Sequence, residues 1–256
     1  MRRTGRRQGC PPSCKFDPGV VQCKAGDGAT CLTAPQVEAV RKIYAGPTNP
    51  RTREQLFYPP QPGSELTWAQ FSGPQPFGLA ADFFKHFVYK DPNWDPRTRP
   101  IKYDTDLALI ERPENLVING ANPNISEFVK RGGKLLLYEG WADGTIPPGV
   151  AINYYKKVVD TIGARTAQDS VGLFMVPGLT HCQAATDDFD SGWHGRMVGE
   201  LEQWIKNKKA PTRIIASSSR DGKVIRTRPL CPYPQVATYK GTGSSDDAAN
   251  FTCKAP

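Results

Sequence analysis

Two residues in the second half of the chain, Asp143 and His181, have side chains that could together carry out acid–base chemistry. Asp143 lies in the segment YEGWADGTIPP, and His181 lies in MVPGLTHC. A histidine can take a proton from a nucleophile near neutral pH, and a neighbouring carboxylate can fix its tautomer and stabilise the imidazolium. These residue types predict His181 as a general base and Asp143 as the group that orients it. The alternative is a structural histidine and an aspartate that caps a turn.

The segments around these residues are typical of an α/β fold. Short apolar runs predict strands, and apolar residues at helical spacing predict helices between them. In chain order, the predicted strands and helices are 134–138, 149–162, 173–176 and 192–206. Such alternation is typical of a doubly wound parallel sheet, whose functional loops follow the carboxyl ends of the strands. Asp143 and His181 each follow a predicted strand, in the order of the last two triad residues of α/β-hydrolases.

The first half of the chain has a different composition. Residues 33–46 and 79–90 predict short helices. Residues 47–78 are rich in Pro and Gly, and the segment DPNWDPRTRP that follows the second helix contains three prolines that interrupt regular structure. We expect this region to form an insertion or lid beside the α/β core.

The basic character of the chain is concentrated at its beginning. The chain has 256 residues and a net charge of +8 at pH 7, and residues 1–15 contain five Arg and Lys residues but no acidic residue. Such an end can bind nucleic acid without specificity, but no aromatic residue is interleaved for base stacking, so we expect no nucleic-acid partner. No apolar run approaches the length of about 18 residues that suggests a membrane span, and none follows the basic residues as a secretory signal requires.

The cysteines indicate an oxidising compartment. The chain has seven Cys, more than a cytosolic protein of this length usually carries, and none belongs to a C-x2-C pair. Four lie early and two lie late in the chain, which favours local disulfide loops. Because the number is odd, at least one thiol has no partner within the chain.

Four long segments resemble the tannase and feruloyl esterase family of α/β-hydrolases. They are CKFDPGVVQCKAGDGATCLTAPQVEAVRKIYAGP near the start, YEGWADGTIPPGVAINYYKKV, MVPGLTHC and TRPLCPYPQVATYKGTGSSDDAANFTC. The resemblance covers residues 14–256 and implies an α/β-hydrolase with a partial sheet and an inserted, loop-rich lid domain. It implies a lid domain 14–118 with a Cys-rich start, followed by the carboxyl-terminal part of the hydrolase core, 119–256. The basic segment 1–13 resembles nothing in the family.

The resemblance also implies an activity, that of a secreted or periplasmic serine carboxylic ester hydrolase acting on esters of aromatic acids such as gallate or hydroxycinnamates. Asp143 matches the triad acid of the family, and His181 matches the triad His. Phe83, Phe87 and Trp94 are candidates for contacts with a phenolic ring, with ordinary core packing as the alternative. The implied partner is a small-molecule aromatic ester, with no membrane and no nucleic acid, and the oligomeric state stays open.

The cysteines acquire specific roles through the same resemblance. The local disulfides that it implies are Cys23 with Cys31 and Cys231 with Cys253. Cys182 matches a cysteine whose partner precedes the nucleophilic Ser, and Cys14 matches one whose partner lies beside a loop that binds structural calcium. Both partners and the calcium loop would lie upstream, so we expect no metal site and no cofactor within this chain.

The nucleophile is where the chain departs from the family. The catalytic Ser of the family lies in a Cys-Ser-x-Gly-Gly context upstream of the lid, but this chain has no G-x-S-x-G motif and no Cys-Ser pair. We therefore expect a truncated enzyme that is inactive by itself. One alternative is a non-catalytic fragment that binds phenolic esters. The other, which rests on the arginine-rich end alone, is a protein that binds anions or nucleic acid.

Overall fold

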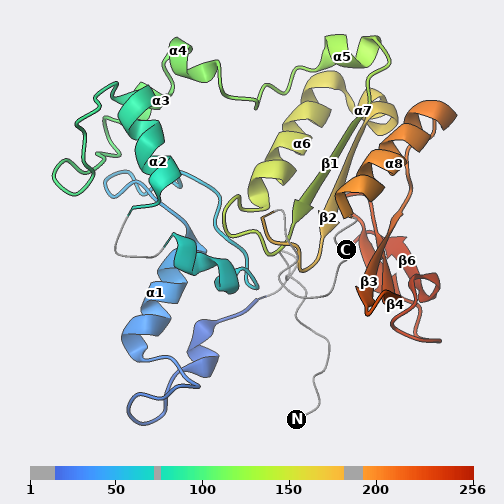
Figure 1. The fold of residues 1–256 in the computed structure, drawn as a ribbon, viewed down its shortest axis with the longest axis horizontal. Coiled ribbons are helices and arrows are strands. Elements are labelled where there is room, and N and C mark those ends of the chain that lie inside the picture. Colours follow the sequence, from blue (N-terminus) through green and yellow to red (C-terminus); the bar gives the residue numbers. More distant parts are fainter. Residues whose placement is uncertain (1–14, 72–75, 182–192) are drawn as a thin grey trace. The chain divides into compact units, whose positions relative to one another are not determined.

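The computed structural model describes residues 15–71, 76–181 and 193–256. The chain divides into two compact units, one α/β unit and one built largely of short helices and loops (Figure 1). The α/β unit comprises the described residues up to Asp17, Pro60–Leu66 and Pro123–Pro256. The second unit comprises Pro18–Pro59 and Thr67–Asn122. Pro60–Leu66 thus groups with the α/β unit although it falls within the segment 14–118.

The α/β unit contains the alternation of strands and helices that the sequence predicts. Its elements are α5 (Ser126–Lys130), β1 (Leu135–Gly140), α6 (Gly149–Ile162), α7 (Ala164–Ser170), β2 (Val171–Val176), α8 (Trp193–Asn207), β3 (Ile214–Arg220), β4 (Lys223–Leu230), β5 (Val236–Tyr239), η4 (Ala248–Asn250) and β6 (Phe251–Lys254). Helix α6 coincides with the predicted helix, and the bounds of β1, β2 and α8 lie within two residues of the predicted ones. The prediction lacks α7 and the strands that follow α8.

Strands β1 and β2 form the parallel pair on which the candidate site depends. Their register runs from Leu135 opposite Val171 to Gly140 opposite Val176. Both strands therefore end at the same edge of the sheet, and the loops that follow them begin side by side.

Alternate side chains of β2 pack on opposite sides of this pair. Phe174 and Val176 share a core cluster with Met197 of α8, whereas Leu173 and Met175 share another cluster with residues of α6. Successive side chains of a strand point to opposite faces, so α6 covers one face and α8 the other (Figure 1). Strand β2 is consequently buried, which explains why its sequence is almost entirely apolar.

The strands that follow α8, for which the sequence gives no prediction above, form antiparallel pairs. Strand β3 pairs with β4 and β5 pairs with β6. Ile214 of β3 and Leu230 of β4 join the cluster around Phe174. The parallel arrangement with helices on both faces is confirmed for β1 and β2 alone. Within the described residues, the other named strands of the unit belong to these two antiparallel pairs.

The second unit begins with a Cys-rich loop and a capped helix. Its elements are η1 (Pro18–Val21), α1 (Ala34–Ala45), α2 (Gly78–Phe83), η3 (Phe84–Val88), α3 (Leu107–Ile110) and α4 (Pro113–Leu116), together with all but the first two residues of η2 (Glu65–Gln70). The predicted helix 33–46 is confirmed as α1. The backbone N–H of Gln36 donates to Thr33 Oγ1, and the N–H of Thr33 donates to Gln36 Oε1 at 2.8 Å. This reciprocal capping box fixes the start of the helix.

The second predicted helix of this unit, 79–90, divides into two parts. Helix α2 continues directly into η3, a π-helical turn in which the N–H of Tyr89 donates to Phe84 O at 2.8 Å. The wider turn differs from the regular helix that the sequence predicts. No helix of the described chain is long and apolar enough to cross a membrane.

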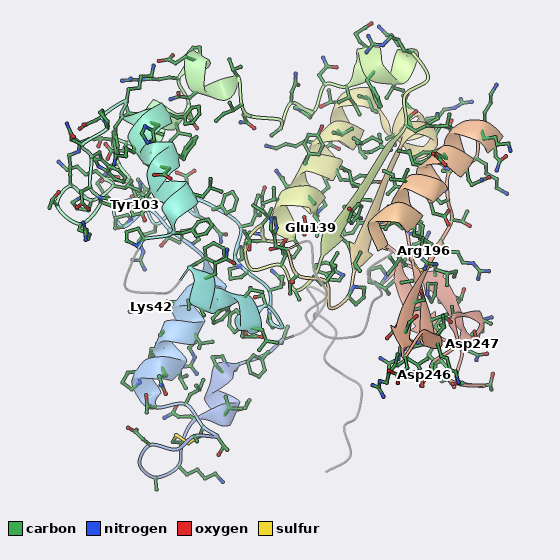
Figure 2. The ribbon with its side chains drawn as sticks, viewed as in Figure 1. Lys42, Tyr103, Glu139, Arg196, Asp246 and Asp247 are labelled. Carbon is green, nitrogen blue, oxygen red and sulfur yellow. A yellow bond between two sulfur atoms is a disulfide. The ribbon has the colours of Figure 1, made fainter. Side chains whose placement is uncertain are left out.

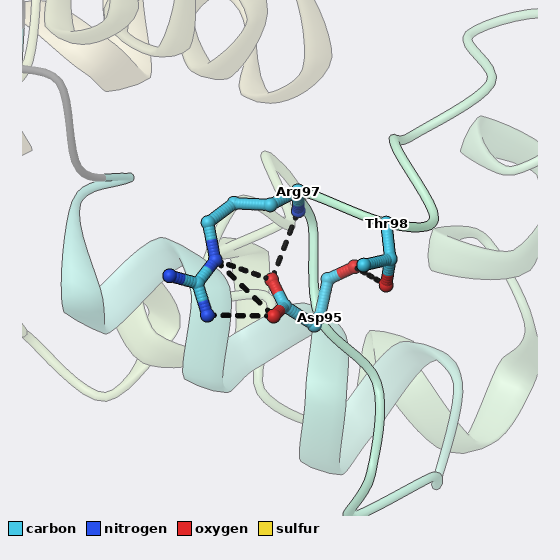
Figure 3. A network of polar contacts seen from close by, with 3 residues as sticks. All are labelled: Asp95, Arg97 and Thr98. Carbon is cyan, nitrogen blue, oxygen red and sulfur yellow. Dashed lines mark hydrogen bonds and ion pairs between the residues drawn. The ribbon is translucent and has the colours of Figure 1, made fainter.

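The proline-rich loop after η3 is ordered by its own polar side chains (Figure 3). The carboxylate of Asp95 accepts hydrogen bonds from the backbone N–H of Arg97 at 2.9 Å and from its guanidinium at 2.7 Å. Thr98 Oγ1 donates to the backbone oxygen of Asp95 at 3.2 Å. The Arg97 guanidinium is the main reason that the pKa of Asp95 falls to about 2.

Candidate active site

The loops that carry Asp143 and His181 are joined by their backbones where β1 and β2 end. The N–H of Trp141 donates to Val176 O at 3.0 Å, and the N–H of Ala142 donates to Leu179 O at 3.1 Å. A Cβ atom on Gly140 would overlap the carbonyl of Leu179, so this close approach requires glycine at position 140. The two loops therefore have a fixed register at their roots.

Asp143 is buried within its own loop. Its side chain is 3% exposed. Oδ1 accepts hydrogen bonds from the backbone N–H groups of Thr145, at 2.7 Å, and Ile146, at 2.8 Å. These bonds hold the carboxylate in one orientation and leave Oδ2 to face the neighbouring loop.

His181 meets this carboxylate from the loop after β2. Its Nδ1 lies 3.0 Å from Asp143 Oδ2, and its side chain is 50% exposed. Because an ionised carboxylate only accepts hydrogen bonds, Nδ1 carries the proton in the neutral ring and Nε2 has the free lone pair. The structure thus brings together the two residues that the sequence singles out, with Nε2 as the ring nitrogen suited to accept a proton.

Glu139 is a further polar residue of the site, and the sequence analysis misses it. It occupies the penultimate position of β1, near the arrowhead of that strand (Figure 2), where its Oε1 accepts from the N–H of Gly140 at 2.8 Å. Burial is the main reason that the pKa of Glu139 rises to about 7. The negative charge of Asp143 and a hydrogen bond with it raise the pKa further, whereas the hydrogen bond from the Gly140 N–H lowers it. An acidic residue at the end of the apolar run LLLYEG was the available signal.

The three aromatic candidates lie in different environments of the second unit. Trp94 is 4% exposed, packs against Tyr89, and donates from Nε1 to the backbone oxygen of Arg99 at 2.9 Å. Phe83 stacks on Phe87, which is 49% exposed. Trp94 therefore has a packing role, and a contact of any of the three with substrate stays a prediction.

Two disulfides that the family resemblance implies are present in the structure. Cys23 is bonded to Cys31, eight residues apart, and Cys231 is bonded to Cys253, 22 residues apart. Cys14 and Cys182 lie outside the described residues. Among residues 15–71, 76–181 and 193–256, no group of three or more His, Cys, Asp or Glu side chains is placed to hold a metal ion. The structural calcium of the resembling family stays a prediction.

A parallel strand pair covered by helices on both faces, with an Asp and a His meeting beyond the strand ends, is the arrangement of an α/β-hydrolase. Solved structures have the same fold. Feruloyl esterase B from Aspergillus oryzae superposes with a TM-score of 0.81 at 26% sequence identity, over 94% of this chain and 50% of that chain. The tannase and feruloyl esterase family model matches residues 9–254, and the chain belongs to this family.

Curated relatives agree with this assignment. An uncharacterized esterase from Xanthomonas campestris pv. campestris is 34% identical over 95% of this chain and 50% of its own length. A probable feruloyl esterase B-2 from Neosartorya fischeri is 31% identical over 90% of this chain and 47% of its own length. The chain spans about half the length of these relatives. The family resemblance seen in the sequence motifs is thus confirmed.

Proposed function

We propose that this chain supplies the acid–base pair of a serine carboxylic ester hydrolase acting on esters of aromatic acids. The observation that carries the proposal is the 3.0 Å contact between His181 Nδ1 and Asp143 Oδ2 at the carboxyl ends of two parallel strands. In this pair, His181 is the general base and Asp143 holds its ring and stabilises the imidazolium.

The reaction follows from the free lone pair on His181 Nε2. As a serine oxygen attacks the ester carbonyl, Nε2 accepts the hydroxyl proton and then passes it to the departing alcohol. The products of this half-reaction are the free alcohol and an acyl-serine ester. A water molecule then attacks the acyl group while Nε2 accepts its proton, and the return of that proton to the serine oxygen releases the aromatic acid.

The nucleophilic serine, in this proposal, comes from a segment outside the 256 residues. This step is supported by the sequence, which contains no G-x-S-x-G motif and no Cys-Ser pair. Without a nucleophile, the Asp–His pair retains at most a small part of its catalytic effect. The chain alone is therefore proposed to be inactive.

Substrate class and location belong to the same proposal. Aromatic-acid esters are supported by the family and by relatives that are probable feruloyl esterases, and the second unit would serve as the lid. The exposed Phe87, with Phe83 stacked on it, offers apolar faces that suit a phenolic ring. A secreted or periplasmic location is supported by the two disulfides, since such bonds persist in oxidising compartments.

Hydrolysis of methyl ferulate tests the proposal. We expect this chain to show only the uncatalysed rate, unchanged by His181→Ala. The portion of the Aspergillus oryzae feruloyl esterase B that this chain does not match can be joined ahead of residue 14 to supply a serine. We expect the joined enzyme to turn over the ester, and Asp143→Asn to lower kcat by about 10⁴. His181→Ala should cost at least as much, whereas His86→Ala in the second unit is the matched control.

Two results would contradict this function. Turnover by the chain alone that disappears in His181→Ala would place a nucleophile within these residues. Turnover by the joined enzyme that does not depend on His181 would show that the Asp–His pair is not the acid–base centre. Calorimetric binding of methyl ferulate without any turnover in the joined enzyme would instead favour a binding fragment.

A further inference from the structure

Strands β1 and β2 differ in what lies beside them in the sheet. The N–H of Trp141 donates to Val176 O at 3.0 Å, and in a parallel pair the backbone groups of alternate residues bond across the pair. The remaining backbone groups of each strand point away from its partner. On β2 this outer side is occupied, because the N–H of Tyr233 donates to Leu173 O at 2.8 Å. Strand β2 is therefore an inner strand.

The outer side of β1, which faces away from β2, has no such neighbour. By the same alternation, the backbone groups of Leu136, Tyr138 and Gly140 point to this side. Within the described part of the chain, β1 pairs with β2 alone. The burial of the two strands agrees with this difference. Every residue of β1 before Gly140 is half-buried, whereas every residue of β2 except Gly172 is buried.

The composition of β1 suits a strand that is paired on both sides. Leu136 packs against the cluster that contains Met197 of α8, and Leu137 packs against the cluster that includes residues of α6, so both faces of the strand are covered. Such an apolar strand is typical of the interior of a parallel sheet. Edge strands are usually protected by Lys, Pro or a bulge, and β1 contains none of these. Strand β1 therefore has the composition of an inner strand at the position of an edge strand.

One end of the outer side is already closed. The N–H of Gly140 points outward and donates to Oε1 of Glu139 at 2.8 Å. This donor is therefore not available to another strand. The outward N–H of Leu136 has no such acceptor among the described residues. A strand that pairs with β1 would therefore bond at Leu136 and end before Gly140.

We propose that the outer side of β1 receives a further strand, parallel to β1, from the segment that supplies the serine nucleophile. This inference rests on the proposed function, which takes that serine from outside the 256 residues. Feruloyl esterase B from Aspergillus oryzae superposes on this chain over 50% of its own length, so that fold includes polypeptide that this chain does not match. The added strand bonds to the backbone of Leu136 and ends before Gly140.

The direction of the added strand follows from the position of the site. Parallel strands have their carboxyl ends on the same side of a sheet, so the loop after a parallel strand begins beside the loops that hold Asp143 and His181. A second copy of this chain is the alternative occupant. Pairing about a two-fold axis would make the two β1 strands antiparallel and would place the two Asp–His pairs at opposite ends of the joined sheet. We therefore assign the outer side of β1 to the serine-bearing segment.

Hydrogen exchange resolved to single backbone amides tests this inference without any ester. The two samples are this chain alone and the joined enzyme described above. The matched control lies in the same strand, because the N–H of Leu137 points to β2 and should be protected in both samples. In this chain alone, we expect the Leu136 amide to exchange about a hundredfold faster than the Leu137 amide. In the joined enzyme, we expect exchange at Leu136 to slow by about the same factor.

Glu139→Ala tests where the added strand ends, and it is measured on this chain alone. The variant removes the acceptor of the Gly140 N–H, so we expect the Gly140 amide to exchange about tenfold faster while Leu137 stays protected. Glu127→Ala is the matched control, since Glu127 lies on α5 in an exposed ion pair with Lys130. Unchanged exchange at Gly140 in Glu139→Ala would contradict an end of pairing before this residue.

Three results would overturn the assignment of the outer side of β1. Protection of Leu136 in this chain alone, in a sample that light scattering shows to be monomeric, would mean that the chain covers this side itself. Protection in a dimer of this chain, with fast exchange in the joined enzyme, would assign the side to a second copy. Fast exchange at Leu136 in a joined enzyme that hydrolyses methyl ferulate would show that the serine-bearing segment binds elsewhere.

The same samples separate this inference from the proposed function. A joined enzyme in which Leu136 is protected but hydrolysis does not depend on His181 would defeat the proposed function and support the added strand. A joined enzyme whose hydrolysis depends on His181 while Leu136 exchanges quickly would do the reverse.

Discussion

At the scale of single residues, the candidate site depends on backbone contacts as much as on its titratable side chains. The carbonyl of Leu179 lies where a side chain on Gly140 would begin, and it accepts the N–H of Ala142 at 3.1 Å. Asp143 is one residue further along. The distance between Asp143 and His181 is therefore set by a contact that only glycine permits.

Gly140→Ala tests this contact. The added methyl group should push the two loop roots apart and lower the free energy of unfolding by about 1–3 kcal/mol, the usual cost of overpacking a tight site. Gly199→Ala is the control, because a Cβ at this helical position meets no atom within 4 Å and should stabilise α8 slightly. Thermal unfolding measures both, and equal effects of the two substitutions would contradict the close approach.

Glu139→Gln should change how stability depends on pH. The pKa of Glu139 is raised to about 7 in the folded chain, above its usual value near 4.5, mainly because the carboxyl is buried. Between these pH values the folded state holds a proton that the unfolded state releases, so stability falls as the pH rises through this window.

Glutamine cannot ionise, so the free energy of unfolding of the variant should increase relative to that of the wild type as the pH rises from 4 to 8. Since the carboxyl is partly exposed, solvent screening reduces the gain to about 1 kcal/mol. Urea unfolding at pH 4 and pH 8 measures it. A difference between variant and wild type that is the same at both pH values would show that the Glu139 carboxyl is not held neutral by folding.

These residues also show what the sequence could and could not predict at this scale. Asp143 and His181 stand directly after apolar strands, in motifs that the family shares, and their meeting follows from parallel strands ending at one edge. Glu139 carries no comparable signal, because its burial depends on tertiary packing around the end of β1, which leaves no local pattern in the sequence. Its raised pKa therefore becomes visible in the structure and not in the sequence.

At the scale of elements, β2 is the centre of the α/β unit. Its alternate side chains face α6 and α8, and the backbone of its Leu173 also accepts the N–H of Tyr233 at 2.8 Å. The sequence predicts this strand because burial on both faces demands an apolar run. The hairpin of β3 and β4 is absent from the predicted elements, although the sequence contains a signal for it. Asp221 and Gly222, with φ of 52° and 73°, form a two-residue Asp-Gly turn of the kind that favours tight hairpins.

Phe174→Ala tests the central position of β2. Phe174 is fully buried in the cluster that contains Met197 and Ile214, so removing its ring should lower the free energy of unfolding by about 3–5 kcal/mol. Ile205→Ala on α8 is the control, because Ile205 is largely exposed and its truncation should cost well under 1 kcal/mol. A small effect of Phe174→Ala in chemical denaturation would contradict the packing of α8 on this strand.

At the scale of the whole molecule, the chain combines an α/β unit that holds the Asp–His pair with a second unit of short helices and loops. The family could be predicted from long motifs, and the model match over residues 9–254 confirms it. The grouping of Pro60–Leu66 with the α/β unit could not be predicted, because it depends on contacts between distant segments and leaves no local pattern. The chain spans about half the length of its curated relatives.

The tautomer of His181 is the most direct test of the site, since the proposed reaction needs a proton on Nδ1 and a free lone pair on Nε2. Long-range ¹H–¹⁵N spectra of the neutral ring distinguish the two nitrogens. We predict that His181 is protonated at Nδ1 in the wild type and loses this preference in Asp143→Asn, while His86 is unaffected. A wild-type ring protonated at Nε2, or a ring indifferent to Asp143→Asn, would contradict the pairing and the acid–base role built on it.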